Sequence, residues 1–208
     1  RPQTEEEKKT YLNYLVQKVY SESESYAQQN NLKQNSVRTL IEFITKKSAS
    51  AFLKLLQENE KFNAYKIYLI SGEILDPKRN QIINAIKSNK DEKVILITTQ
   101  VIEAGVDIDM DIGFKDRSLI DSDEQLAGRI NRNAEKKNCK VFMFDYDGTS
   151  FIYKGDKRLK VEPMYQKKVY MDILKTKDFD TNFYNIVHSE ITKINESDAI
   201  KNLLDYKN

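Results

Sequence analysis

The order of apolar segments constrains this sequence more than any other feature. Between residues 36 and 144, short apolar runs of strand length alternate with amphipathic segments of about ten residues. The runs that are predicted strands are Ser36–Ile44, Lys66–Ile70, Val94–Thr98, Met110–Phe114 and Cys139–Phe144. The segments with helical periodicity are Ala49–Glu58, Asp76–Lys87 and Ser122–Arg132. Because strands that alternate with helices form βαβ units, we predict an α/β fold with a parallel sheet flanked by helices.

Helical segments flank this alternation on both sides. A helix is predicted over Thr4–Gln29, since Thr4 and Glu7 form a capping box and apolar residues follow at helical spacing. After about Val161 the sequence becomes mostly helical, with an apolar stripe formed by Phe183, Ile186, Val187, Ile191 and Ile194. We therefore expect residues 1–160, including the helix 4–29, to form the α/β domain and residues 161–208 to form a helical extension or linker.

Composition excludes several classes of protein. Lys and Arg number 34 against 32 Asp and Glu, so any contact with phosphate must come from a local cluster of positive side chains. The single cysteine, Cys139, excludes a disulfide framework and a cysteine-cluster zinc site, and we predict no metal site. The sequence has neither a run of about 18 apolar residues nor a signal-peptide pattern, so we expect a cytoplasmic protein without membrane contact. It begins with Arg-Pro rather than Met, and we expect it to be a piece of a longer protein.

The segment Thr98-Thr-Gln-Val-Ile-Glu-Ala-Gly-Val-Asp107 directly follows a predicted strand. In a parallel sheet, ligands bind beyond the carboxyl ends of the strands, so chemistry should be sought at this turn. Gly105 permits a tight backbone or the close approach of a ligand. The carboxylate of Asp107 could accept a hydrogen bond from a sugar hydroxyl or hold an arginine.

The segment Gln125-Leu-Ala-Gly-Arg-Ile-Asn-Arg132 carries a pair of arginines. Arg129 and Arg132 are three residues apart, so on the predicted helix both would point the same way. Two guanidinium groups on one face suit a triphosphate, because each matches phosphate oxygens and neither loses its proton. Arginine pairs at this spacing are usually solvated surface charge; the order of the two segments within one α/β domain favours the functional reading.

These two segments resemble motifs V and VI of superfamily 2 helicases, and Thr39–Lys47 resembles the strand of motif IV. The longer run Thr98–Asp109, together with Asp121-Ser122 before Gln125, is similar to the CRISPR-associated helicase–nuclease of type I systems. The resemblance extends over roughly Tyr11 to Val161 and implies a RecA-like lobe. One residue departs from the pattern, since Leu126 stands where the family often has an arginine.

The resemblance assigns roles to individual residues. Those expected to face ATP are Gly105, Asp107, Gln125, Arg129 and Arg132. Arg129 and Arg132 would act as catalytic arginine fingers that stabilise charge on the γ-phosphate during hydrolysis. The residues expected to contact the nucleic-acid backbone are Thr99, Thr45 and Lys46.

The resemblance also implies cofactors and partners that are not visible in these residues. ATP and Mg²⁺ would be bound mainly by an N-terminal RecA-like lobe of the same protein. The track would be single-stranded DNA, travelled in the 3′-to-5′ direction. The implied partners are a crRNA-guided surveillance complex and a metal-dependent HD nuclease, fused or separate.

Motifs that the sequence lacks limit what it does alone. It has no Gly-x-x-x-x-Gly-Lys-Ser/Thr loop and no Asp-Glu run after a strand, which are the groups that grip phosphates and Mg²⁺. We therefore expect this chain by itself to be inactive as an ATP hydrolase. It also lacks a His-Asp pair suited to a metal nuclease, since its one histidine is His188.

Three other interpretations stay open at this stage. The nearest is a lobe of a generic superfamily 2 RNA or DNA helicase. A second is a haloacid-dehalogenase-like phosphatase, because Asp145-Tyr-Asp147-Gly-Thr follows an apolar strand as in that family. That family has its motif on the first core strand, whereas here the motif follows the last predicted strand, which favours a simple turn. A third is a non-catalytic module that binds a partner through its C-terminal helices.

Overall fold

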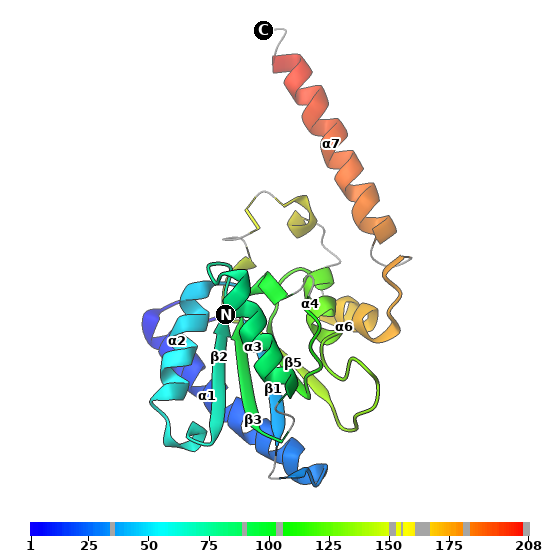
Figure 1. Cartoon of the computed structure of the whole chain (residues 1–208). Helices are drawn as coiled ribbons and strands as arrows, with labels where there is room; N and C mark the ends of the chain where they lie inside the picture. Colours follow the sequence, from blue (N-terminus) through cyan, green and yellow to red (C-terminus); the bar gives the residue numbers. More distant parts are fainter. Residues whose placement is uncertain are drawn as a thin grey trace. The chain divides into compact units, whose positions relative to one another are not determined.

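The structure is a computed structural model that describes residues 1–33, 36–88, 91–102, 106–149, 153–154, 156–160, 167–180 and 184–205 (Figure 1). The chain divides into two compact units, Arg1–Ile152 and Tyr153–Asn208. Each unit is described by itself. All of the candidate functional residues lie in the first unit.

The first unit contains a five-stranded parallel sheet. Its strands are β1 (Val37–Glu42), β2 (Tyr65–Ile70), β3 (Lys93–Thr98), β4 (Ile112–Asp116) and β5 (Lys140–Phe144). The order across the sheet is β2-β3-β1-β4-β5, and every neighbouring pair is parallel. The predicted α/β class with a parallel sheet is therefore confirmed, and all five predicted strands are present.

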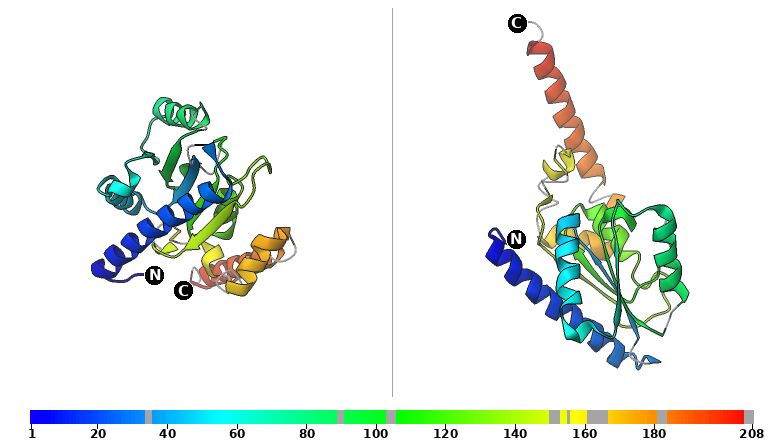
Figure 2. Two further views of the ribbon diagram at one scale, coloured as in Figure 1. Left: turned by 90° about the horizontal axis from the view of Figure 1, so that it is seen from below. Right: turned by 60° about the vertical axis from the view of Figure 1, so that its left-hand side comes forward.

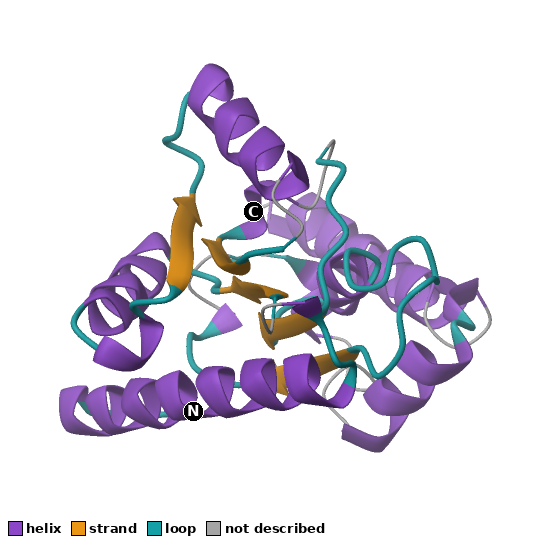
Figure 3. Cartoon of the chain, turned by 60° about the horizontal axis from the view of Figure 1, so that its bottom comes forward, coloured by secondary structure: helices purple, strands orange, loops and turns teal. Residues whose placement is uncertain are grey.

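Helices cover both faces of this sheet. In the described part of the first unit, the helices are α1 (Glu5–Gln29), α2 (Lys46–Gln57), α3 (Asp76–Ser88) and α4 (Ile120–Ala127), with short 3-10 turns η2 (Glu60–Phe62) and η3 (Gln100–Ile102). Figure 2 shows α1 and α2 on one side of the sheet and α3 on the other, and Figure 3 shows the same layering end-on. A capping box fixes where α1 begins: Thr4 accepts a hydrogen bond from the Glu7 amide, and the Glu7 side chain accepts from the Thr4 amide, as predicted.

Alternation along the strands explains why the unit has two hydrophobic cores. On β1 the buried Leu40 packs with α3 and α4, whereas its neighbour Ile41 packs with α1 and α2. The same alternation separates Leu96 from Ile95 on β3. Since successive side chains of a strand point to opposite faces, a strand that is apolar throughout must be covered twice.

The helix predicted over Ser122–Arg132 is wrong in its second half. The helix α4 ends at Ala127, Gly128 closes it, and Ile130 pairs with Met110 as an isolated β-bridge. Asn131 then adopts φ 51°, a left-handed conformation that asparagine tolerates better than most residues. Burial overrides helical spacing here, because Ile130 packs against the edge of β4 at Gly113. A Cβ at Gly113 would lie 2.9 Å from Ile130 Cγ1, so only glycine leaves room for this turn.

The second unit contains the turn η4 (Lys157–Lys160) and the helices α6 (Lys167–Thr176) and α7 (Asn185–Asp205). The helical content predicted for the tail is confirmed. Of the apolar stripe predicted there, Phe183 lies outside the described residues, and the other four members lie on α7. His188 also lies on α7 and is exposed to solvent.

Candidate functional site

Asp107 and the two arginines of Gln125–Arg132 come together at the surface of the first unit. Arg132 Nη1 lies 3.2 Å from Asp107 Oδ1, and Lys87 Nζ lies 2.9 Å from the other oxygen of the same carboxylate. Arg129 is half-buried beside them and interacts electrostatically with both Asp107 and Arg132. The cluster thus gathers three cations around one carboxylate, which leaves an excess of positive charge suited to a phosphate group.

Backbone hydrogen bonds bring these side chains together from distant parts of the sequence. Met110 N donates to Arg129 O at 2.9 Å, and Asn131 N donates to Met110 O at 2.9 Å. The Arg132 amide donates to Asp109 Oδ1 at 2.9 Å. Residues 129–132 are therefore held by the segment that follows Asp107. The two arginines converge because of these backbone contacts, and not because they lie on one face of a helix as the sequence predicts.

The charges of the cluster shift the acid–base properties of its members. A hydrogen bond from Lys87, helped by the charges of Lys87 and Arg132, lowers the pKa of Asp107. Burial lowers the pKa of Arg129, and the nearby charge of Arg132 lowers it further. The lowered pKa keeps Asp107 ionised as a partner for Arg132.

Two other residues expected to face ATP are placed less directly. Gly105 lies outside the described residues. Gln125 is exposed on α4, one helical turn before Arg129. Leu126, which departs from the family pattern, is buried in the core near Ile130 and Gly113, so at this position the chain uses an apolar side chain to pack α4 onto β4.

The residues predicted to contact nucleic acid form a second group, at the carboxyl edge of the sheet. Thr99 follows β3, and its amide donates to Ile70 O at the end of β2 at 3.3 Å. Thr45 follows β1 as the N-cap of α2, where its hydroxyl accepts from the Ser48 amide. Lys46 is exposed and forms an ion pair with Glu73, which follows β2. These three residues therefore come from the carboxyl ends of neighbouring strands.

The two groups lie at different ends of the sheet, which the sequence does not anticipate. The arginine cluster is held by Met110 just before β4 begins, and Lys87 lies at the end of α3, ahead of β3. Thr98 and Thr99 lie at the carboxyl edge of the sheet, where we expected the chemistry. Asp107 lies toward the amino ends because the segment between β3 and β4 must return across the sheet before a parallel strand begins.

A buried ionic network lies near the carboxyl ends of β1 and β4, and sequence reasoning missed it. Lys115 on β4 is fully buried, forms an ion pair with Glu42 at the end of β1, and lies 2.9 Å from Ser122 Oγ on α4. Its Nζ also lies 3.8 Å from Asp123 Oδ1. The signal that could have revealed it is a lysine within the apolar run Ile112–Asp116, since a lysine is almost never fully buried without a partner.

The carboxylates of the phosphatase-like motif have structural partners. Asp145 Oδ1 accepts from Arg117 Nε at 3.0 Å. Asp147 accepts from the Thr45 amide at 2.9 Å and from Ser48 Oγ at 2.7 Å, so it caps the start of α2. Among the described residues there is no group of three or more His, Cys, Asp or Glu side chains able to hold a metal ion. These contacts favour a simple turn after β5 over the nucleophile motif of a phosphatase.

A pH-dependent contribution to stability comes from Asp116, which is fully buried at the end of β4. Burial raises the pKa of its carboxyl group to about 7, although the amides of Tyr146 and Asp147 donate to it and act in the opposite direction. Between the ordinary pKa and about 7, the folded chain binds a proton that the unfolded chain has released. Stability is therefore lost as pH rises through this range.

We expect the unfolding free energy of the wild-type chain, minus that of an Asp116→Asn variant, to decrease by about 1.4 kcal/mol for each pH unit from about pH 4 to about pH 7. Asparagine does not titrate, so the variant removes this contribution and leaves those of other groups. Urea unfolding at four pH values measures the difference. A difference that stays constant, or that grows with pH, would contradict the assignment.

In the part of the chain that the structure describes, no helix combines the length and the apolar character needed to cross a lipid bilayer.

Comparisons with known proteins give the geometry a context. Residues 34–135 match the family model described as the C-terminal part of the CRISPR-associated nuclease/helicase Cas3. Among curated proteins, the Cas3 nuclease/helicase of Methanothermobacter thermautotrophicus is 33% identical over 135 residues, which are 62% of this chain and 15% of that protein.

Solved structures give the same fold. The crystal structure of T. fusca Cas3 matches with a TM-score of 0.56 and 16% identity, over 80% of this chain and 23% of that one. The Mycobacterium smegmatis helicase Lhr, bound to ssDNA and AMP-PNP, matches with a TM-score of 0.51 and 14% identity, over 79% of this chain and 19% of that one. The chain therefore spans less than a quarter of the length of each of these proteins.

Proposed function

This chain is a C-terminal helicase lobe of the Cas3 type, within superfamily 2, and from this premise we propose that it supplies half of an ATP site shared with a first RecA-like lobe. The observation that carries the proposal is the cluster of Arg129, Arg132 and Asp107 on the surface of the lobe. The half-buried Arg129 and the exposed Arg132 beside one carboxylate give the cluster a net positive charge. A triphosphate presented by a facing lobe would complete this arrangement.

In this proposal each side chain has a separate task. Arg132 would reach the γ-phosphate and stabilise the charge that develops during hydrolysis, as an arginine finger does. Arg129, which is more buried, would hold a fixed position beside it. Asp107 would keep Arg132 oriented before ATP arrives, while Gly105 and Gln125 would complete the surface that faces the nucleotide.

The carboxyl edge of the sheet would contact the nucleic acid. Thr99 follows β3, and Thr45 and Lys46 follow the neighbouring β1, so these residues would follow a sugar-phosphate backbone without reading its sequence. The ion pair between Lys46 and Glu73 would be exchanged for a contact with phosphate. Because this edge and the arginine cluster lie at different ends of the sheet, one lobe would engage ATP and the track at the same time.

The wider setting follows from the Cas3-type relatives. We propose that the complete protein translocates on single-stranded DNA, with closure of the two lobes on ATP and reopening after hydrolysis driving each step. Its partners would be a crRNA-guided surveillance complex and an HD nuclease. Mg²⁺ would accompany ATP and neutralise phosphate charge, held mainly by the first lobe. Residues 1–160 would form the functional lobe, residues 161–208 a helical extension, and the protein would act in the cytoplasm.

A comparison of two samples tests the shared site. In the complete protein we expect ATP hydrolysis that is stimulated by single-stranded DNA, whereas the 208-residue chain alone is expected to be inactive. A colorimetric phosphate assay with and without an oligo-dT strand measures both. Hydrolysis by the isolated chain would refute the shared site. Stimulation by RNA in place of DNA would favour the generic superfamily 2 helicase instead.

A further inference from the structure

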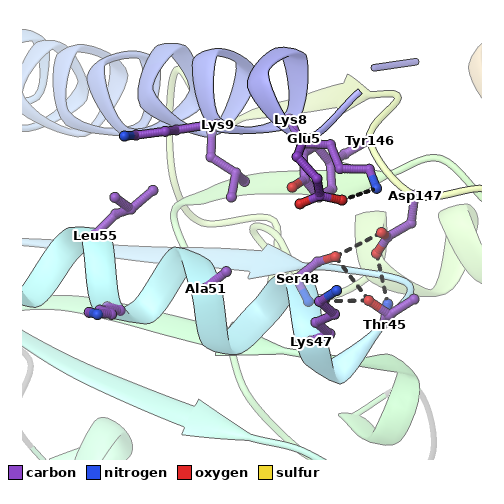
Figure 4. Close-up of a pocket in the computed structure, with 12 residues that line it drawn as sticks. Glu5, Lys8, Lys9, Thr45, Lys47, Ser48, Ala51, Leu55, Tyr146 and Asp147 are labelled. Carbon is purple, nitrogen blue, oxygen red and sulfur yellow. Dashed lines mark hydrogen bonds and ion pairs between the residues drawn. The ribbon is translucent and has the colours of Figure 1, made fainter. Parts of the chain in front are cut away.

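An open groove lies between α1 and α2, on the face of the sheet opposite the arginine cluster (Figure 4). It has a volume of about 590 Å³, and its floor is apolar, formed by Leu12 of α1 and by Ala51 and Leu55 of α2. Thr45 and Ser48 lie at one end, where α2 begins. The groove therefore starts at the carboxyl edge of the sheet, next to the proposed contacts with nucleic acid, and continues along the two helices.

Four lysines line this groove, against two carboxylates. Lys8 and Lys9 come from α1, and Lys47 and Lys54 come from α2. The carboxylates are already engaged, since Glu5 pairs with Lys8 at 2.9 Å and Asp147 caps α2. Lys54 lies 3.7 Å from Glu58, outside the groove. Within the described structure, Lys9 and Lys47 have no carboxylate within ion-pair distance, so the groove has an excess of positive charge.

The arrangement of the lysines suits an extended anion better than a compact one. Lys47 and Lys54 are seven residues apart, which is about 10 Å along the same side of α2, and Lys8 and Lys9 face them from α1. A single phosphate would need the charges to converge on one point. At the start of α2, the Thr45 amide and the Ser48 hydroxyl already donate to Asp147, so these two donors do not form a compact phosphate site.

We propose that this groove binds the backbone of a single nucleic-acid strand and extends its path from Thr45 and Lys46 along the outer face of the lobe. The lysines would contact successive phosphates, while the apolar floor would accommodate the sugars. This inference rests on the proposed function for the existence of a nucleic-acid track, and it adds a second stretch of that track, away from the ATP-facing side. The groove is contiguous with the track, which favours a nucleic acid over an acidic protein segment.

The test measures binding of a fluorescein-labelled dT25 strand to the complete protein by anisotropy, between 50 and 200 mM salt. The variant is the double substitution Lys9→Gln and Lys47→Gln. If both lysines contact phosphate, the slope of log affinity against log salt decreases in magnitude by about 1.4, since each contact with a single strand contributes about 0.7. At 0.1 M salt the same loss corresponds to affinity about ten- to thirtyfold weaker.

A matched control has the same change in charge at the other end of the sheet. Lys33→Gln with Lys66→Gln removes two exposed lysines near the amino ends of β1 and β2, and we expect it to change the slope little. If the groove variant keeps the wild-type slope, or changes no more than this control, the proposal is overturned and an acidic protein segment becomes the better occupant. ATPase activity of the wild-type protein at saturating dT25 separates the two proposals, because it is present if only the groove assignment fails and absent if the proposed function fails.

Discussion

In the complete protein, replacing Arg132 with alanine is expected to lower DNA-stimulated ATP turnover by about two orders of magnitude or more. The side chain is exposed, held only by Asp107 within the described structure, and not part of the core, so its loss should leave the fold intact. Arg129→Ala should have an effect of similar size on turnover. Its guanidinium is half-buried, and this variant should also lower thermal stability slightly.

The kinetic pattern distinguishes an arginine finger from a residue that merely binds ATP. A group that acts on the γ-phosphate in the transition state lowers kcat, whereas uniform binding of the nucleotide alters KM. Arg132→Lys should remain strongly impaired, because an ammonium group does not reproduce the two-pronged contact of a guanidinium with phosphate oxygens. Lys137→Ala removes an exposed charge five residues further on and is the matched control. Full turnover in Arg132→Ala would exclude the finger.

The largest expected effect on stability comes from Lys115→Ala. This lysine is fully buried between Glu42 and Asp123, so its removal would leave two carboxylates buried without that cation. Breaking a buried ion pair by removing one partner costs about 3–5 kcal/mol, because the remaining charge is not solvated. Urea unfolding of the 208-residue chain, followed by circular dichroism, measures the loss.

An exposed lysine gives the comparison for Lys115. Lys140, on β5, is 52% exposed and lies 4.0 Å from Glu22, so Lys140→Ala should change stability by no more than about 0.5 kcal/mol. A double variant, Lys115→Met with Glu42→Gln, should recover part of the loss, since it removes one of the buried carboxylates together with the lysine. If Lys115→Ala is as stable as Lys140→Ala, the buried network does not stabilise the fold.

Much of the fold was predictable because its signals are local. Strand-length apolar runs and helical spacing predicted the parallel sheet, and Thr4 with Glu7 predicted where α1 begins. The interpretation failed where burial competes with spacing. Ser122–Arg132 has helical periodicity, yet the helix ends at Ala127 because Ile130 packs against Gly113 and pairs with Met110.

The candidate site was predictable as a set of residues but not as an arrangement. Local residue patterns were enough to predict the α/β class, the order of the two motifs, and the arginines and aspartate within them. The contact of Arg132 with Asp107, the contact of Lys115 with Glu42, and the lysine-lined groove between α1 and α2 could be seen only in the folded chain. The reason is physical: periodicity reports contacts three or four residues apart, whereas these pairs are 25, 73 and about 40 residues apart and meet only when the sheet sets the register of its strands.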